Sequence, residues 1–177
     1  MTSKYIIPFE KRPIKIGQGF NNKEGSHRKW FKNKADMSYS IDFYLPEGTK
    51  IIASRGGIVV AVRVEGKKNY SGENIKKGQI ACDKWMNEIG IKHSDGTYAD
   101  YAHVKYKGAF VKVGDKVKQG QVIGLSGNTG WSSESHLDFS VFKRNIGNFR
   151  IKTIKINFKD YDSPLENKEI IKSLCKK

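Results

Sequence analysis

Cysteine is scarce in this sequence, and long hydrophobic runs are missing altogether. Cys82 and Cys175 are the only cysteines among 177 residues, which excludes a disulfide-rich scaffold. We expect two free thiols, with a bond between them left as an alternative. No stretch reaches the about 20 apolar residues of a transmembrane helix. The N-terminal segment lacks the apolar core and cleavage site of a signal peptide, so these residues leave the protein's location open.

Acidic residues are outnumbered by basic ones. The 18 Asp and Glu residues stand against 33 Lys and Arg residues, which gives a formal net charge of +15. Such a charge attracts polyanions, namely nucleic acid, an anionic membrane or an anionic cell-wall polymer. The lysines are dispersed, which is typical of a hydrated surface, and basic and aromatic residues do not interleave as they do in nucleic-acid-binding proteins. We therefore do not expect a nucleic-acid partner.

Glycine turns separate short β-rich runs through most of the chain. Residues 49–64 (TKIIASRGGIVVAVRV) predict a hairpin around their Gly-Gly pair, and residues 89–104 predict a second hairpin around an Asp-Gly turn. Strands at this spacing, with turn signals between them, are typical of antiparallel sheets. The sequence therefore predicts an all-β fold of antiparallel sheets and hairpins.

The chain length suits a single domain that buries a core of its own. We expect a monomeric β domain over residues 1–160, with a polar insertion loop at about residues 66–84. The SPLE sequence at residues 163–166 is a helix-capping pattern, and Ile170, Ile171 and Leu174 after it would form one apolar stripe of a helix. Residues 161–177 therefore predict a short C-terminal helical appendage.

Two polar residues alternate with apolar ones in the stretch SHLDFSV. His136 and Asp138 are two positions apart, so in a strand they project from the same face, whereas Leu137 and Phe139 project into the core. Such a pair can bind a metal or move a proton, but a polar strand face open to water fits it equally well. The rest of the chain must decide between these interpretations.

The sequence offers enough donor side chains for one divalent cation with catalytic groups left over. Histidine and carboxylate side chains are common ligands of catalytic metals. Taken singly, each histidine is more typical of a surface or hydrogen-bonded residue than of a ligand. The donors are His27, His93, His103, His136, Asp42 and Asp138.

An ordered series of segments resembles the lysostaphin-type, LytM-like murein endopeptidases. These segments are SH at 26–27, YSIDFYLPEGTKIIASRGGIVV at 39–60, IKHSDGTYADYAHV at 91–104, VKVGDKVKQGQVIGLSGNTG at 111–130 and SHLDFSV at 135–141. The resemblance extends from about residue 5 to residue 141. It implies the β fold of that family, a zinc enzyme that cuts peptide cross-bridges in bacterial cell walls, and a location outside the cell or in its envelope.

The resemblance also implies roles for individual residues. His27 and Asp42 match the first two metal ligands of the family. His103 and His136 match the two histidines that orient and deprotonate the attacking water and stabilise the oxyanion. Asp138 occupies the position of the third metal ligand, which is a histidine in the family.

Neighbouring residues receive supporting roles. His93 matches a frequent family position on the adjacent strand, and we expect it either to support a site residue or to be structural. Tyr101 and Tyr98 are expected on the same strand as His103, and either is a candidate donor of a hydrogen bond to the reaction intermediate. Both are more typical of tyrosines that pack in the core. Asn128 and Thr129 are expected to shape the turn before the His136 strand.

Asp138 leaves three alternatives for the metal. In the first, His27, Asp42 and Asp138 hold the ion, and the two carboxylates make it a weaker Lewis acid than the zinc site of the family. Zn²⁺ is then the expected ion, with Mn²⁺ or Fe²⁺ favoured more than usual by oxygen ligands. In the second, His136 or His103 becomes a ligand, and in the third no metal binds usefully.

Two functions follow from the sequence. The first is a metal-dependent endopeptidase that hydrolyses peptide bonds in peptidoglycan cross-links or a related peptide, while the basic surface holds an anionic wall polymer. The second is a catalytically degenerate module that binds wall polymer or a regulatory protein partner without cleavage. The departure at Asp138 is the reason for keeping the second.

Overall fold

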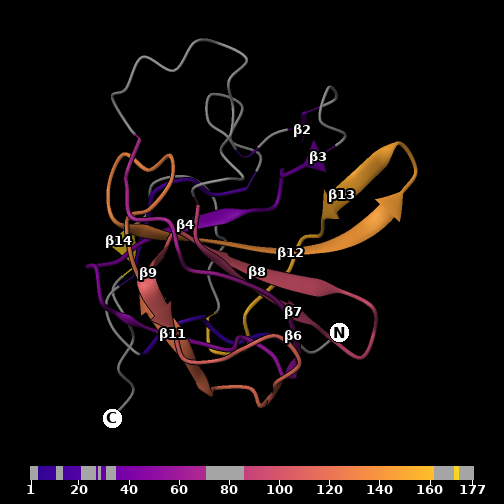
Figure 1. Ribbon diagram of the computed structural model, residues 1–177. Coiled ribbons are helices and arrows are strands. Elements are labelled where there is room, and N and C mark those ends of the chain that lie inside the picture. The colour runs from indigo at the N-terminus through magenta and orange to yellow at the C-terminus, as the bar shows by residue number, and fades with distance from the viewer. Residues whose placement is uncertain are drawn as a thin grey trace.

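The computed structural model describes residues 4–10, 14–20, 27, 29–30, 35–70, 86–161 and 170–171. Within these ranges the chain forms strands and no helix (Figure 1), which confirms the predicted all-β fold. The strands are β1 (Ile14–Ile16), β2 (Lys29–Trp30), β3 (Ala35–Asp36), β4 (Ile41–Tyr44), β5 (Lys50–Ile52), β6 (Gly57–Arg63), β7 (Glu88–Lys92), β8 (Tyr98–Ala102), β9 (Val104–Ala109), β10 (Lys116–Val117), β11 (Val122–Ser126), β12 (His136–Ile146), β13 (Phe149–Thr153) and β14 (Ile170–Ile171).

The strands form two sheets. The large sheet has the order β10-β6-β7-β8-β12-β13-β3-β2, and β4 joins it by pairing with β12 on one side and β1 on the other. The small sheet has the order β5-β11-β9. Pairing between described strands is antiparallel, as predicted, except that β13 runs parallel to β3.

The long strand β12 organises the centre of the large sheet. Its first residues lie between β4 and β8, and its later residues pair with β13. Asp138 is directly opposite Asp42 of β4 on one side and Ala102 of β8 on the other. The register of β12 therefore brings residues from three distant segments into one row.

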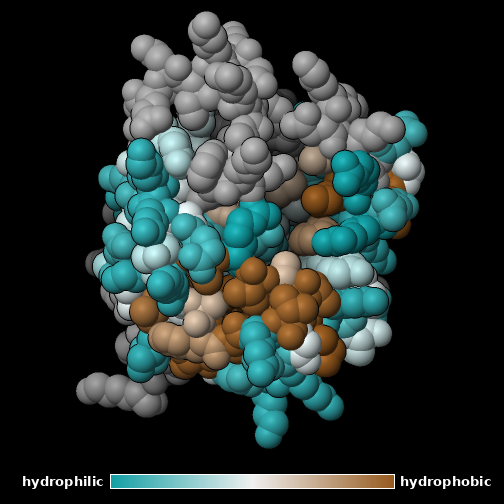
Figure 2. Space-filling model, viewed as in Figure 1, coloured by the Kyte–Doolittle hydropathy of each residue, from teal (hydrophilic) through white to brown (hydrophobic). Residues whose placement is uncertain are grey.

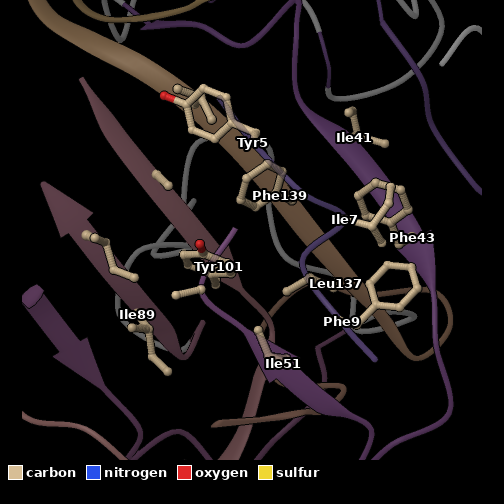
Figure 3. Packing of buried hydrophobic residues seen from close by; sticks show 14 of the residues in the cluster. Tyr5, Ile7, Phe9, Ile41, Phe43, Ile51, Ile89, Tyr101, Leu137 and Phe139 are labelled. Atoms are coloured by element: carbon tan, nitrogen blue, oxygen red, sulfur yellow. The ribbon is translucent and has the colours of Figure 1, made fainter. Parts of the chain in front are cut away.

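The core explains why these strands hold that register. Leu137 and Phe139 of β12 and Ile41 and Phe43 of β4 are fully buried. Figure 3 shows them in one cluster with Ile51, which comes from the small sheet. Because side chains alternate along a strand, the residues between these apolar ones project from the opposite face of the sheet. The predicted burial of Leu137 and Phe139 is confirmed.

The hairpin predicted for residues 49–64 is wrong. β5 pairs with β11, whereas β6 pairs with β7 and β10, so this segment crosses from the small sheet to the large one. A two-residue hairpin turn requires positive φ at its glycines, and neither Gly56 nor Gly57 has a positive φ. A Cβ on Gly57 would clash with the backbone carbonyl oxygen of Lys92. The glycine pair therefore permits close packing rather than a reversal.

The second predicted hairpin, in residues 89–104, is confirmed. β7 and β8 pair antiparallel over five residue pairs, from Glu88 with Ala102 to Lys92 with Tyr98. Gly96 adopts a φ of 78° in the turn, which glycine adopts without a steric penalty. The turn is closed by Asp95, whose carboxylate accepts hydrogen bonds from the backbone and hydroxyl of Thr97.

The C-terminal helix is not borne out at the two positions described there. Ile170 and Ile171 form β14, antiparallel to β1, so the prediction of helix for them is wrong. Isoleucine is β-branched and favours strands, and β1 supplies the backbone partners. The capping residues 163–166 and both cysteines lie outside the described residues, as does most of the insertion at 66–84. The division into domains stays a prediction.

One side of β6 faces solvent. Val59 is fully buried, whereas Ile58 and Val60 on either side of it are 42% and 38% exposed. Figure 2 shows an apolar area, surrounded by hydrophilic residues, in the region where Figure 1 labels β6. Across the described ranges, no helix has the length and apolar character needed to cross a membrane.

Candidate metal centre

Three donor side chains converge on one face of the large sheet. Asp42 and Asp138 face each other across β4 and β12, and His27 lies before β2. The Nε2 atom of His27 is 3.1 Å from Oδ1 of Asp42 and 3.9 Å from Oδ1 of Asp138. One ligand atom from each residue fits within a 4.8 Å span. The structure therefore brings together the three predicted metal ligands.

The donor atoms at this point are buried and lack hydrogen bonds. Both ring nitrogens of His27 and the Oδ1 atoms of Asp42 and Asp138 have no hydrogen-bond partner, so the 3.1 Å approach of His27 and Asp42 does not have hydrogen-bond geometry. Unpaired buried polar atoms cost about 1–3 kcal/mol each. A divalent cation would satisfy one atom from each residue at once, so the donor set fits a metal.

Gln18 orients the carboxylate of Asp42. Its Nε2 donates a hydrogen bond of 2.8 Å to Oδ2 of Asp42, which leaves Oδ1 turned toward His27. The chain is held close here because the backbone N–H of Asp42 donates to the carbonyl of Gln18 at 2.8 Å. Such a contact orients a ligand without touching the ion. Gln18 could not be predicted from the sequence, because nothing in the short segment around it shows that it lies against β4.

The charges around His27, Asp42 and Asp138 favour a positive charge among them. Burial lowers the pKa of His27, but the contact with Asp42 and the charge of Asp138 outweigh burial and raise it to about 9. Burial and the charge of Asp42 raise the pKa of Asp138 to about 6. Burial opposes ionisation of Asp42, yet the nearby His27 lowers its pKa. In the absence of a metal, a proton on His27 partly balances the two carboxylates.

His103 and His136 lie together beside this group. Their ring centroids are 4.3 Å apart, and Nε2 of His136 is 3.7 Å from Oδ1 of Asp42. Nδ1 of His103 is 2.6 Å from the carbonyl oxygen of Thr129, and Nδ1 of His136 is 2.7 Å from that of Glu134. A carbonyl oxygen only accepts, so each Nδ1 carries a proton and each neutral ring has its lone pair on Nε2. Burial and the neighbouring His136 lower the pKa of His103 to about 4, which keeps it neutral.

The other predicted residues have structural contacts. Nδ1 of His93 is 2.9 Å from the carbonyl oxygen of Gly56, and this histidine is not part of the metal group. The hydroxyl of the fully buried Tyr101 accepts a hydrogen bond from the backbone of Ser54. Tyr98 stacks on Phe142 with ring centroids 5.5 Å apart. These contacts favour structural and packing roles for His93 and both tyrosines.

The fold and the arrangement of donors define an all-β domain with a candidate metal site. Residues 36–149 match Peptidase family M23, and the chain belongs to this family. The matched range contains Asp42, His103, His136 and Asp138 but begins after His27. The family implies a metal, which is consistent with the donor set.

The relatives found by sequence include two proteins from staphylococci. Lysostaphin from Staphylococcus simulans is 37% identical over 114 residues, which is 63% of this chain and 19% of the relative. Glycyl-glycine endopeptidase ALE-1 from Staphylococcus capitis is 37% identical over 112 residues, or 62% of this chain and 26% of the relative. The matched part therefore spans a fifth to a quarter of the length of these relatives.

Solved structures agree with the family. The catalytic domain of lysostaphin from Staphylococcus simulans superposes with a TM-score of 0.53 at 29% identity, covering 79% of this chain and 88% of that domain. A zinc-containing peptidase from Vibrio cholerae gives a TM-score of 0.55 at 25% identity, covering 89% of this chain and 40% of the other. The predicted lysostaphin-like fold is confirmed.

Proposed function

We propose that this domain is a metal-dependent endopeptidase that hydrolyses peptide bonds in peptidoglycan cross-links or a related peptide. His27, Asp42 and Asp138 hold the metal, and His103 and His136 are the catalytic residues. One observation carries the proposal: three buried donor atoms without hydrogen bonds converge beside two histidines that carry their lone pairs on Nε2. The names of the lysostaphin and glycyl-glycine endopeptidase relatives support the substrate class.

The chain's own residues account for the proton transfers. When bound, the metal supplies Lewis-acid activation of the scissile carbonyl and of the attacking water. His103 is neutral and buried, so its Nε2 accepts a proton from that water. Nε2 of His136 lies 3.7 Å from Oδ1 of Asp42, and its lone pair accepts a hydrogen bond from the water and so orients it. His103, once protonated, then gives this proton to the leaving amine.

The two carboxylates affect which ion is bound. Zn²⁺ is the ion expected for this family, and the donor set of one nitrogen and two oxygens also suits Mn²⁺ or Fe²⁺. An anionic ligand set reduces the ion's Lewis acidity, so hydrolysis is expected to be slower than with two histidines. The aspartate is thus compatible with catalysis at reduced metal acidity.

The location and the binding of the polymer are part of the same proposal. The net charge of +15 holds an anionic wall polymer near the site, and the cell envelope or the extracellular space is where that polymer occurs. A monomer suffices, because the five residues of the site come from one chain.

Metal loading followed by peptide hydrolysis tests this function. We expect purified protein loaded with Zn²⁺, Mn²⁺ or Co²⁺ to cleave cross-linked or glycine-rich wall peptides, and we expect Asp42→Asn to lose both metal binding and cleavage. Metal content is measured by mass spectrometry and cleavage by chromatography. Protein that stays inert with all three ions contradicts the proposal.

A degenerate binding module is the second candidate, and Asp138 is the observation that favours it. In the family position this residue is a histidine, and an aspartate reaches less far from its strand. If the native protein only binds, Asp138→His should create metal-dependent hydrolysis where none existed. If the native protein is an enzyme, the variant should change its rate without creating activity. Peptide release by both proteins under identical metal loading separates the two functions.

A further inference from the structure

A frame of buried hydrogen bonds holds Val104, the residue that follows His103. Its centre is Asn87, which is fully buried. The side-chain amide of Asn87 donates to the carbonyls of Gly66 and Val104 at 2.9 and 3.1 Å, and its Oδ1 accepts from the N–H of Gly66 at 2.8 Å. Its backbone carbonyl accepts from the N–H of Val104 at 3.2 Å. Asn87 therefore holds both backbone groups of Val104, the residue after His103.

Thr129 connects this frame to the histidine ring. Its hydroxyl donates to the carbonyl of Val104 at 3.0 Å and accepts from the backbone N–H of Asn87 at 3.2 Å. Its own carbonyl accepts from Nδ1 of His103 at 2.6 Å. Thr129 is 6% exposed, so water does not readily replace these bonds. One residue thus joins the frame by its side chain and the ring by its backbone.

The backbone of His103 needs such support. His103 has a φ of 63°, in the left-handed region that costs free energy for any residue with a Cβ. It is the single residue between the end of β8 and the start of β9. A strained conformation persists where the surroundings over-determine it. Two sets of hydrogen bonds supply that constraint. Asn87 and Thr129 hold the backbone of Val104, and the carbonyl of Thr129 holds the ring of His103.

We propose that Asn87 and Thr129 are positioning residues that fix the ring of His103 with its proton on Nδ1 and its lone pair on Nε2. A neutral imidazole can carry its proton on either nitrogen, and the acceptor it faces decides which. If the carbonyl of Thr129 moves, the ring loses that acceptor. The inference deepens the proposed function, since it rests on His103 acting as the base.

A set of threonine variants separates positioning from stability. Thr129→Val keeps the side-chain volume and removes both hydroxyl bonds, whereas Thr129→Ser keeps them. Thr153→Val is the matched control, because the buried Thr153 also donates to a carbonyl, that of Asp36, and accepts from a backbone N–H, that of Tyr39. Thr153 does not contact His103.

The readout that reports on position is the tautomer of His103. Long-range proton–nitrogen NMR of the metal-free protein at neutral pH should show Nδ1–H alone in the native protein, Thr129→Ser and Thr153→Val. Thr129→Val should show both tautomers or an exchange-broadened ring. In metal-loaded protein, kcat for Thr129→Val should fall by about 10- to 100-fold, the range for groups that support an active-site residue, with KM unchanged.

The outcomes are separable. A ring that keeps Nδ1–H alone in Thr129→Val overturns the inference, as does an equal loss of kcat in Thr153→Val. If Thr129→Val does not fold, Asn87→Asp carries the same test, because it removes the amide donors to Val104 and Gly66 and keeps the side-chain size. If the native protein cleaves no peptide, the proposed function fails, while the tautomer measurement still decides the positioning role.

Discussion

At the residue scale, a metal and protons compete for the same side chains. The pKa of His27 is raised to about 9 and that of Asp138 to about 6 in the metal-free protein. Both must lose a proton to coordinate an ion. The protons that these side chains hold in the metal-free protein are therefore released when a metal binds.

This competition predicts the pH dependence of metal affinity. Between pH 6 and 9 one proton leaves His27, so affinity should rise about tenfold per pH unit, and below pH 6 a second proton, on Asp138, should make the dependence steeper. Titration calorimetry in buffers of different ionisation enthalpy measures both the affinity and the protons released. His93→Gln, which changes a histidine outside the metal group, should keep the slope. An affinity independent of pH from 6 to 8 contradicts the prediction.

At the element scale, the core strand β12 holds the site residues in register. Phe139 is fully buried, whereas Phe110 is 59% exposed. Phe139→Ala should lower the free energy of unfolding by about 3–5 kcal/mol, because it leaves a cavity behind Asp138. Phe110→Ala should change it by about 0.5 kcal/mol or less. Urea denaturation compares the two, and equal losses would show that the β12 register does not depend on this core.

The loop before β12 depends on a glycine. Gly130 has a φ of 81°, and a Cβ there would lie 2.9 Å from Cα of Met86. Gly147 also has a positive φ, of 56°, but a Cβ there would meet open space. Gly130→Ala should therefore lose more stability than Gly147→Ala, by about 1–3 kcal/mol, and should lower kcat because Thr129 moves. Thermal unfolding and kinetics of both variants check this, and equal behaviour contradicts it.

At the scale of the whole molecule, the proposed binding to the cell wall depends on charge. With a net charge of +15, binding to isolated walls that carry anionic polymer should weaken as salt rises. Co-sedimentation measures the bound fraction at low and high ionic strength. Exposed Lys112 provides a matched pair: Lys112→Glu should weaken binding, and Lys112→Arg should not. Binding that does not change with salt contradicts an electrostatic mode.

Features that depend on a few neighbouring residues could be predicted from the sequence. The Asp-Gly turn predicted the β7–β8 hairpin, and the alternation in SHLDFSV predicted that His136 and Asp138 share a face. The pairing of β5 with β11 was missed, because two glycines in sequence do not show which strand will lie alongside. Asn87 was missed for a similar reason: its partners, Gly66, Val104 and Thr129, are far apart in the chain and meet only through the sheets.

We infer that Asp138 serves as a metal ligand together with His27 and Asp42. The most direct test is a crystal structure of metal-loaded protein, with the ion identified by anomalous scattering. We expect one ion about 2.0–2.2 Å from a nitrogen of His27 and from a carboxylate oxygen of each aspartate. An ion held without Asp138, or no ion at saturating metal, would contradict it.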